Sequence, residues 1–283
     1  MLAPAKINLD LRITGRRTDG YHLLDSIVVF TEFGDELKAE VSNQLEIDIS
    51  GPFASDLPKS NNNLILKSCK LLCEVAGVQP NIKFYLTKNL PVSSGIGGGS
   101  ADAAAAMNLT RKILSLNIND NNFNDIGVNV GADVPVCLRS VSSHMSGIGN
   151  KINQLYFQDD LYILLVNPRI SISTSDIFKK YTKSNVDFDT QRQIYNNKIN
   201  LLPIIRSLNR SKNSLQNVVC NLNKEVPAIL DILAKTSEVL LSRMSGSGAT
   251  CFGVYHTAED CHNAANMVRL FNKDWWLKET KIL

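Results

Sequence analysis

The sequence lacks a long apolar stretch. Its longest clear apolar run is LYILLV at residues 161–166, whereas a membrane-spanning helix needs about 20 consecutive, mostly apolar residues. The first residues, MLAPAKINLDLRI, carry Lys6 and Asp10 where a secretory signal has an unbroken apolar segment. These features predict a soluble protein of the cytoplasm.

A marked excess of one charge is also missing. The chain has 30 lysines and arginines against 27 aspartates and glutamates, spread without blocks, for a net charge of +3. Nucleic-acid-binding domains show clustered basic residues, so a nucleic-acid partner is not expected. A chain of 283 residues with 44% hydrophobic and 20% charged residues has the composition of a folded protein, and its length favours two domains.

Cysteine is too sparse for a disulfide scaffold. The six cysteines are spread along the chain, at positions 69, 73, 137, 220, 251 and 261. Reduced and mostly buried thiols are the expected state in a chain of this length. Cys251, His256, Cys261 and His262 come nearest to a metal cluster, but their spacing matches none of the paired zinc patterns, so no metal ligand is predicted.

Strand and helix patterns alternate through the first half. Ile7, Leu9, Leu11 and Ile13 alternate with polar residues, which predicts a half-buried strand. Residues 63–77 place Leu64, Lys67, Leu71, Leu72 and Val75 at helical spacing and stop at Gly77, a good C-terminal cap. Residues 81–87 have the alternation of another strand.

The second half has a different order of patterns. Residues 140–154 are rich in serine, glycine and asparagine and predict turns around one short strand. Strands are expected at 161–166 and 250–255, and helices around 201–208 and 226–240. The polar stretch 183–200 is compatible with a loop or a solvated helix. The boundary is placed at residue 150, before an α+β second domain.

The segment LPVSSGIGGGSADAAAAM, residues 90–107, has four glycines in a short span followed by alanines. Missing side chains let a ligand approach the backbone closely, and the free amides at a helix start favour an anion. The loop is therefore predicted to hold phosphate, with Ser100 capping the helix. Its spacing fits neither the dinucleotide fingerprint nor a P-loop. A glycine-rich turn without a ligand is the alternative.

Four segments together carry a family resemblance: APAKINL at 3–9, the glycine loop, GADVP at 131–135 and MSGSG at 244–248. In this order they resemble the GHMP kinase superfamily. The resemblance implies a mixed α/β fold with an N-terminal domain over 1–150, like ribosomal protein S5 domain 2. It also implies a ferredoxin-like C-terminal domain over 151–283, with the active site in the cleft between the two. The opening, including DGYH, resembles the branch that phosphorylates cytidine diphosphate-linked sugar alcohols.

A kinase of this kind needs a base for the acceptor hydroxyl and positive charge near the phosphoryl group. By the resemblance, Asp133 is the base and Lys6 is its charge partner, which keeps the carboxylate ionised. Without the resemblance, Asp133 in GADVP would be read as an ordinary helix cap. Lys6 would be read as a solvated surface lysine.

The resemblance also assigns residues to the two substrates. Cytosine is expected to stack between aromatic side chains, with Tyr21 and His22 on one side and Phe178 on the other, and His22 is the candidate to read the edge of the base. Asn8, Thr174 and Asp133 are the other expected contacts of this substrate. ATP is expected to bind Pro91, Ser93, Ser94, Gly95, Gly97, Gly98, Gly99, Ser100, Asn63 and Lys88. Ser245, Gly246, Ser247 and Gly248 are expected to close over the site. ATP is the predicted co-substrate with Mg²⁺, and the chain is a monomer or a homodimer.

Some residues depart from the family pattern. Asn150 and Gln216 stand where glutamate is usual, and Ile96 and Ala101 replace a leucine and a serine. Two further kinds of protein remain open: another small-molecule kinase of the homoserine or mevalonate type, or a catalytically silent nucleotide-binding protein. A decarboxylase on the same scaffold is a third.

Overall fold

The computed structural model describes residues 1–57, 63–157, 159–184, 186–192 and 200–283. Its internal contacts divide the chain into two compact units. Unit 1 comprises residues 1–6, 33–92 and 97–140, and unit 2 comprises 7–32, 93–96 and 141–283. These units interleave along the sequence, whereas the predicted division at residue 150 is a single cut. That domain boundary stays a prediction.

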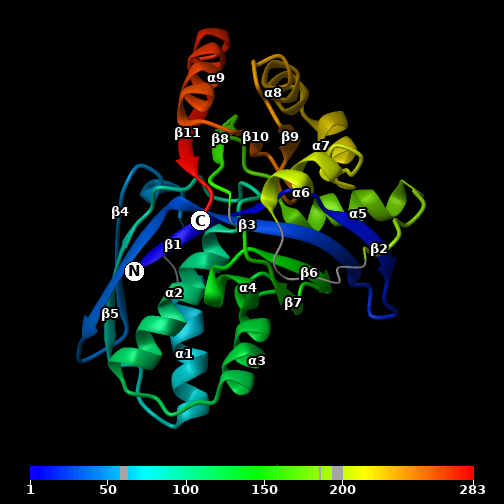
Figure 1. Cartoon of the computed structure of the whole chain (residues 1–283). Helices are drawn as coiled ribbons and strands as arrows, with labels where there is room; N and C mark the ends of the chain where they lie inside the picture. Colours follow the sequence, from blue (N-terminus) through cyan, green and yellow to red (C-terminus); the bar gives the residue numbers. More distant parts are fainter. Residues whose placement is uncertain (58–62, 158, 185, 193–199) are drawn as a thin grey trace. The chain divides into compact units, whose positions relative to one another are not determined.

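Among the described residues, unit 1 combines a group of strands that includes the second half of β3 (His22–Val41) with four α-helices. Strands β4 (Glu46–Ser50) and β5 (Ile82–Thr87) are parallel, and β5 pairs antiparallel with this half of β3. A short 3₁₀ helix spans Ala54–Asp56. The helices pack against one another (Figure 1) and are α1 (Leu64–Ala76), α2 (Gly98–Ile113), α3 (Asp120–Val130) and α4 (Val134–Arg139).

Helix α1 ends as the sequence predicts, because Gly77 takes a left-handed φ of 67° that a side chain would strain. Its buried face differs from the expected spacing. Lys67 and Val75 are exposed, and the face that packs inward is formed by Ile65, Leu66, Ser68, Cys69, Leu72 and Cys73. The predicted strand at 81–87 is confirmed as β5.

Helix α2 lies close to α1. Ala103, Ala104, Ala105 and Ala106 are buried, and the Ser68 hydroxyl oxygen of α1 lies 3.3 Å from the Ala103 carbonyl oxygen. Small side chains permit this approach. The alanine run thus fixes the helix that follows the glycine loop against the core of unit 1.

Unit 2 contains strands that pair with the first half of β3, and a second sheet of four strands. Strands β2 (Arg12–Arg16) and β6 (Ser143–Gly147) pair antiparallel with this half of β3, and β7 (Lys151–Gln154) pairs with β6. Two strands therefore occupy 140–154, where the sequence predicted one.

The second sheet of unit 2 has the antiparallel order β11-β8-β10-β9. Its strands are β8 (Tyr162–Asn167), β9 (Leu241–Met244), β10 (Cys251–Tyr255) and β11 (Trp276–Lys281). Its helices are α5 (Thr174–Lys183), α6 (Leu201–Leu208), α7 (Gln216–Leu222), α8 (Glu225–Ala234) and α9 (Ala258–Phe271). Helices between β8 and β9 and between β10 and β11 give the predicted ferredoxin-like arrangement.

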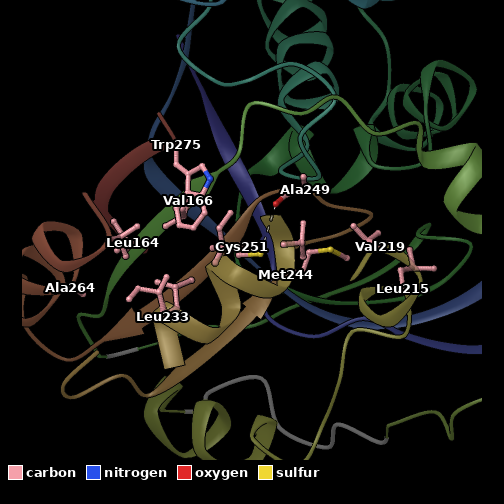
Figure 2. Packing of buried hydrophobic residues seen from close by; sticks show 14 of the residues in the cluster. Leu164, Val166, Leu215, Val219, Leu233, Met244, Ala249, Cys251, Ala264 and Trp275 are labelled. Atoms are coloured by element: carbon pink, nitrogen blue, oxygen red, sulfur yellow. Dashed lines mark hydrogen bonds between the residues drawn. The ribbon is translucent and has the colours of Figure 1, made fainter. Parts of the chain in front are cut away.

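Helices cover this sheet over an apolar core. Leu164, Met244 and Cys251 from the strands pack with Val219 of α7 and Leu233 of α8 in one buried cluster (Figure 2). Helix α7 was missed by the sequence analysis. Of the polar stretch 183–200, residues 186–192 form neither helix nor strand, and residues 185 and 193–199 lie outside the described residues.

The strand expected over residues 7–13 is interrupted. It forms the end of β1 (Leu2–Asn8) and the start of β2, and the residues between are irregular. The alternate polar residues Asn8 and Asp10 are buried, so the prediction of a strand with one solvent-exposed face was wrong. The reason is hydrogen bonding, because Asp10 accepts from the Ile27 amide at 3.0 Å and its carbonyl oxygen from the Ser26 hydroxyl.

No helix within the described residues is both long and apolar enough to cross a membrane.

Candidate active site

The first functional pair lies in unit 1. Lys6 Nζ is 2.7 Å from Asp133 Oδ2, with the lysine side chain 4% and the aspartate 37% exposed. Asp133 precedes α4, but its side chain makes no capping hydrogen bond. The carboxylate that GADVP alone would assign to a helix cap therefore pairs with the buried ammonium. One side of the carboxylate stays accessible to a substrate, as a general base requires.

Glycines open the start of α2 beside this pair. Gly97 has a φ of 67° and is the N-cap, and a Cβ on it would lie 3.0 Å from the Lys6 Cβ. The predicted cap at Ser100 is wrong, because the helix begins at Gly98 and Ser100 lies in its first turn. Glycine is favoured at this N-cap because residues with a side chain rarely adopt a left-handed φ. The first amides of α2, which suit an anion, are thus near Lys6.

Lys88 lies beneath the same turn and is buried. Its ammonium is 2.5 Å from Asp35 and 2.7 Å from Asp102, and a Cβ on Gly98 would lie 3.2 Å from Nζ. Burial lowers the pKa of Lys88, but the two carboxylates raise it by more. Burial raises the pKa of Asp102 to about 7, against the opposing effect of Lys88. Asp35 also accepts hydrogen bonds from the Asn89 and Leu90 amides.

The ammonium of Lys88 already has two partners. The sequence analysis assigned Lys88 to ATP, but its ammonium is bound to the carboxylates of Asp35 and Asp102 inside unit 1, next to Gly98. Asn63, also assigned to ATP, caps α1 by accepting a hydrogen bond of 2.9 Å from the Ile65 amide. Both side chains therefore have structural partners, and a nucleotide contact through either stays a prediction.

In unit 2, the first part of the glycine loop meets the MSGSG segment. The Ser245 hydroxyl donates to the Gly95 carbonyl oxygen at 3.0 Å, and the Thr250 amide to that of Ser94. Gly95 has a φ of 78°, and a Cβ on it would lie 2.6 Å from the Ser245 carbonyl oxygen. Segments far apart in sequence are thus held in contact. Closure of a cleft by the MSGSG segment stays a prediction.

Two side chains that hold this segment complete its support. Asn213, which the sequence analysis missed, donates to the carbonyl oxygens of Met244 and Gly246 at 2.8 Å each. Gln216 accepts from the Met244 amide at 3.0 Å. Because a glutamate carboxylate would accept the same bond, the departure from the family pattern preserves this contact.

Asn8 is buried beside the same segment. Its amide donates to the Ser245 hydroxyl at 3.1 Å, and its side-chain nitrogen donates to Ser26 at 2.8 Å. Its side-chain oxygen is buried and has no hydrogen-bond partner within the described residues. A buried acceptor of this kind is suited to a ligand donor.

The predicted cytosine residues also lie in unit 2. The His22 and Phe178 rings are 5.1 Å apart between centroids and tilted by 32°. Tyr21 is 60% exposed, and the Thr174 hydroxyl is 2.8 Å from the Ser247 hydroxyl. The structure therefore joins His22 to Phe178 and Thr174 to the MSGSG segment. Stacking of a base between Tyr21 and Phe178 stays a prediction.

Comparison with known proteins defines the family. Residues 63–140 match the GHMP kinases N terminal domain, and residues 194–274 match the GHMP kinases C terminal domain. A 4-diphosphocytidyl-2-C-methyl-D-erythritol kinase of Roseobacter denitrificans is 38% identical over 100% of this chain and 93% of its own length. The kinase of the same name from Paramagnetospirillum magneticum is 36% identical over 99% and 97%. The chain belongs to the 4-diphosphocytidyl-2-C-methyl-D-erythritol kinase family.

Solved structures agree in fold. A 4-(cytidine 5'-diphospho)-2C-methyl-D-erythritol kinase superposes with a TM-score of 0.80 at 24% identity, covering 100% of this chain and 98% of the other. A homoserine kinase from Cytophaga hutchinsonii gives 0.68 at 15% identity over 99% and 92%. The shared fold is the mixed α/β GHMP kinase fold, and as a member of this kinase family the chain uses ATP.

In this member of the kinase family, the side chains that support the predicted site residues were not foreseen from the sequence. The sequence analysis missed Asp35, Asp102 and Asn213. Each binds a lysine or a backbone group that is distant in sequence, and no local sequence motif marks such a contact. Thr182 could have been noticed, since it lies four residues after Phe178 and so on the same face of α5.

Proposed function

We propose that this kinase transfers the γ-phosphoryl group of ATP to the 2-hydroxyl of 4-diphosphocytidyl-2-C-methyl-D-erythritol, which gives the 2-phosphate and ADP. The substrate is supported by full-length relatives that carry this name at 36–38% identity. The observation that carries the chemistry is the 2.7 Å contact between Lys6 and Asp133, with the carboxylate partly exposed. The reaction belongs to the non-mevalonate route to isoprenoid precursors.

Asp133 accepts the proton of the attacking hydroxyl, and Lys6 stabilises negative charge on the attacking oxygen and the γ-phosphate. The amides at the start of α2 hold the phosphates, because Gly97, Gly98 and Gly99 leave the backbone uncovered. Phosphoryl transfer needs positioning and charge compensation more than covalent chemistry, and these groups supply both. The remaining loop residues, Pro91 to Gly95 and Ser100, shape the loop.

The cytidyl end of the substrate binds in unit 2, where His22 and Phe178 are in contact. Stacking of a base on an aromatic side chain is worth about 1–3 kcal/mol in single-strand binders. Tyr21 is exposed and free to cover the base from the other side. Asn8 offers its unpartnered oxygen, and Thr174 and the segment Ser245–Gly248 close over the substrate.

Mg²⁺ belongs to this proposal because the triphosphate charge must be neutralised. Within the described residues, no group of three His, Cys, Asp or Glu side chains could hold a metal ion. We infer that one or two carboxylates at most contribute from the described residues, as is usual where Mg²⁺ binds phosphates. We place the enzyme in the cytoplasm, where its six cysteines stay reduced, as a monomer or homodimer.

The test is ATP consumption by the purified protein with the cytidyl substrate, and in parallel with homoserine and mevalonate. Cytidine is added as a competitor, and Asp133→Asn is the matched inactive variant. Turnover with the cytidyl substrate alone, inhibited by cytidine and lost in the variant, is expected.

Other outcomes would redirect the assignment. Turnover with homoserine or mevalonate would keep the kinase and discard the cytosine site. Binding of ATP without turnover on any of the three alcohols would make the chain a silent nucleotide-binding protein.

A further inference from the structure

The His22 ring is oriented by helix α5. It contacts the Phe178 ring at 5.1 Å, and the Tyr181 ring meets it edge-on at 6.0 Å and 77°. On the same helix face, the Thr182 hydroxyl oxygen is 3.1 Å from His22 Nε2. Three side chains of one rigid element thus fix both the plane of the imidazole and the partner of one of its nitrogens.

The partner of Thr182 decides which imidazole nitrogen carries the proton. The Thr182 hydroxyl donates to the Phe178 carbonyl oxygen at 3.0 Å. A hydroxyl has one proton, and a carbonyl oxygen can only accept. For both hydrogen bonds to exist, Thr182 must accept from His22, so Nε2 carries the hydrogen. In the neutral ring, Nδ1 is then a lone-pair acceptor.

The imidazole is held neutral by its surroundings. Burial lowers the pKa of His22, and the positive charge of Arg16 lowers it further. Arg16 lies across the hairpin from His22, because the two residues pair between β2 and β3. A neutral ring with a fixed tautomer distinguishes a donor from an acceptor on its ligand, whereas a protonated ring donates from both nitrogens.

We propose that Thr182 is a positioning residue that sets base specificity by holding His22 as the Nε2–H tautomer, so that Nδ1 accepts from the exocyclic amino group of cytosine. Uracil has an oxygen at that position, which would face the Nδ1 lone pair without a hydrogen between them. The inference rests on the proposed function, because it takes the cytidyl end to bind at His22 and Phe178.

The tautomer is tested without turnover. In protein labelled with ¹⁵N-histidine, the two ring nitrogens of His22, assigned by comparison with His22→Gln, report which one is protonated at neutral pH. Nε2–H is expected in the native protein, with a mixture in Thr182→Val. A native ring protonated at Nδ1, or on both nitrogens, would overturn the proposal.

Specificity is tested with Thr182→Val and Thr182→Ser against the cytidyl substrate and its uridyl analogue. The valine variant should lose about tenfold in preference for the cytidyl substrate, through KM more than kcat, as expected for one hydrogen bond. Serine should restore the preference. Ser184→Ala is the matched control, because its hydroxyl also donates back into α5, to the Tyr181 carbonyl oxygen.

An unchanged preference in Thr182→Val, in a variant that melts like the native protein, would overturn the role of Thr182. If the native protein phosphorylates no cytidyl substrate, the proposed function fails and the specificity claim fails with it. The histidine spectrum still decides the tautomer in that case, so the two failures are distinguishable.

Discussion

Lys6 and Asp133 meet at 2.7 Å in unit 1, one from the first strand and the other from the residue before α4. The ammonium is buried and the carboxylate is partly exposed. The ion pair orients the carboxylate while leaving part of it accessible, as the proposed role of a base toward the acceptor hydroxyl requires. The pair lies beside the glycine start of α2, so the proposed base is close to the amides that we propose hold phosphate.

Replacement of Asp133 by asparagine should lower kcat by about 10²–10⁴-fold, the usual contribution of a general base, with little change in the KM for ATP. Steady-state kinetics with the cytidyl substrate measure both constants. Asp125→Asn removes an exposed carboxylate of α3 and serves as the control. Equal activity of the two variants would exclude Asp133 as the base.

Lys6 should act through the same step as Asp133. Lys6→Met should lower kcat by about 10²-fold or more, because charge stabilisation at the phosphoryl group is lost. The double variant Lys6→Met with Asp133→Asn should lose far less than the product of the single effects, since groups that act as a unit are not additive. Strictly multiplicative losses in the double-mutant cycle would show that the residues work independently.

Two glycines of the phosphate loop should respond differently to alanine. Gly95→Ala places a Cβ 2.6 Å from the Ser245 carbonyl oxygen at a φ of 78°, so backbone must shift. Gly99→Ala meets only the end of the Leu64 side chain at 3.3 Å, at the start of a helix where alanine is favoured. We expect a lower melting temperature for Gly95→Ala and a near-native melting temperature for Gly99→Ala. Similar values for both would contradict the close approach.

Asp102 should make stability depend on pH. Because its pKa is raised from 3.8 to about 7, the folded state retains a proton over this range that the unfolded chain releases. The free energy of unfolding should therefore fall as pH rises from about 4 to about 7, by a few kcal/mol at most. Asp102→Asn cannot titrate and should lack this part of the fall. Urea unfolding of both proteins across this range is the measurement, and parallel curves would argue against a raised pKa.

Local structure was predicted correctly where the residues that cause it lie within one short stretch of the chain. The cap at Gly77 and the strand β5 follow from glycine conformation and alternation, whereas the ferredoxin-like order of the second sheet was implied by the family resemblance. The N-cap of α2 was wrong because a serine was preferred on propensity, whereas the bare Gly97 is needed next to Lys6. The polar residues Asn8 and Asp10 were placed on a wet face because their buried partners lie elsewhere in the sequence.

The sequence by itself determined the family, because membership depends on residue types in fixed local motifs. From the same motifs it predicts the phosphate loop and the roles of Asp133 and Lys6, which stay predictions. Only the tertiary structure decided that Lys88 is bound by Asp35 and Asp102, that Asn213 holds the MSGSG segment, and that Thr182 meets His22. Each of these is a hydrogen bond or ion pair between distant segments. Such a contact forms only when folding brings the two segments together, so no pattern of residue spacing in the sequence predicts it.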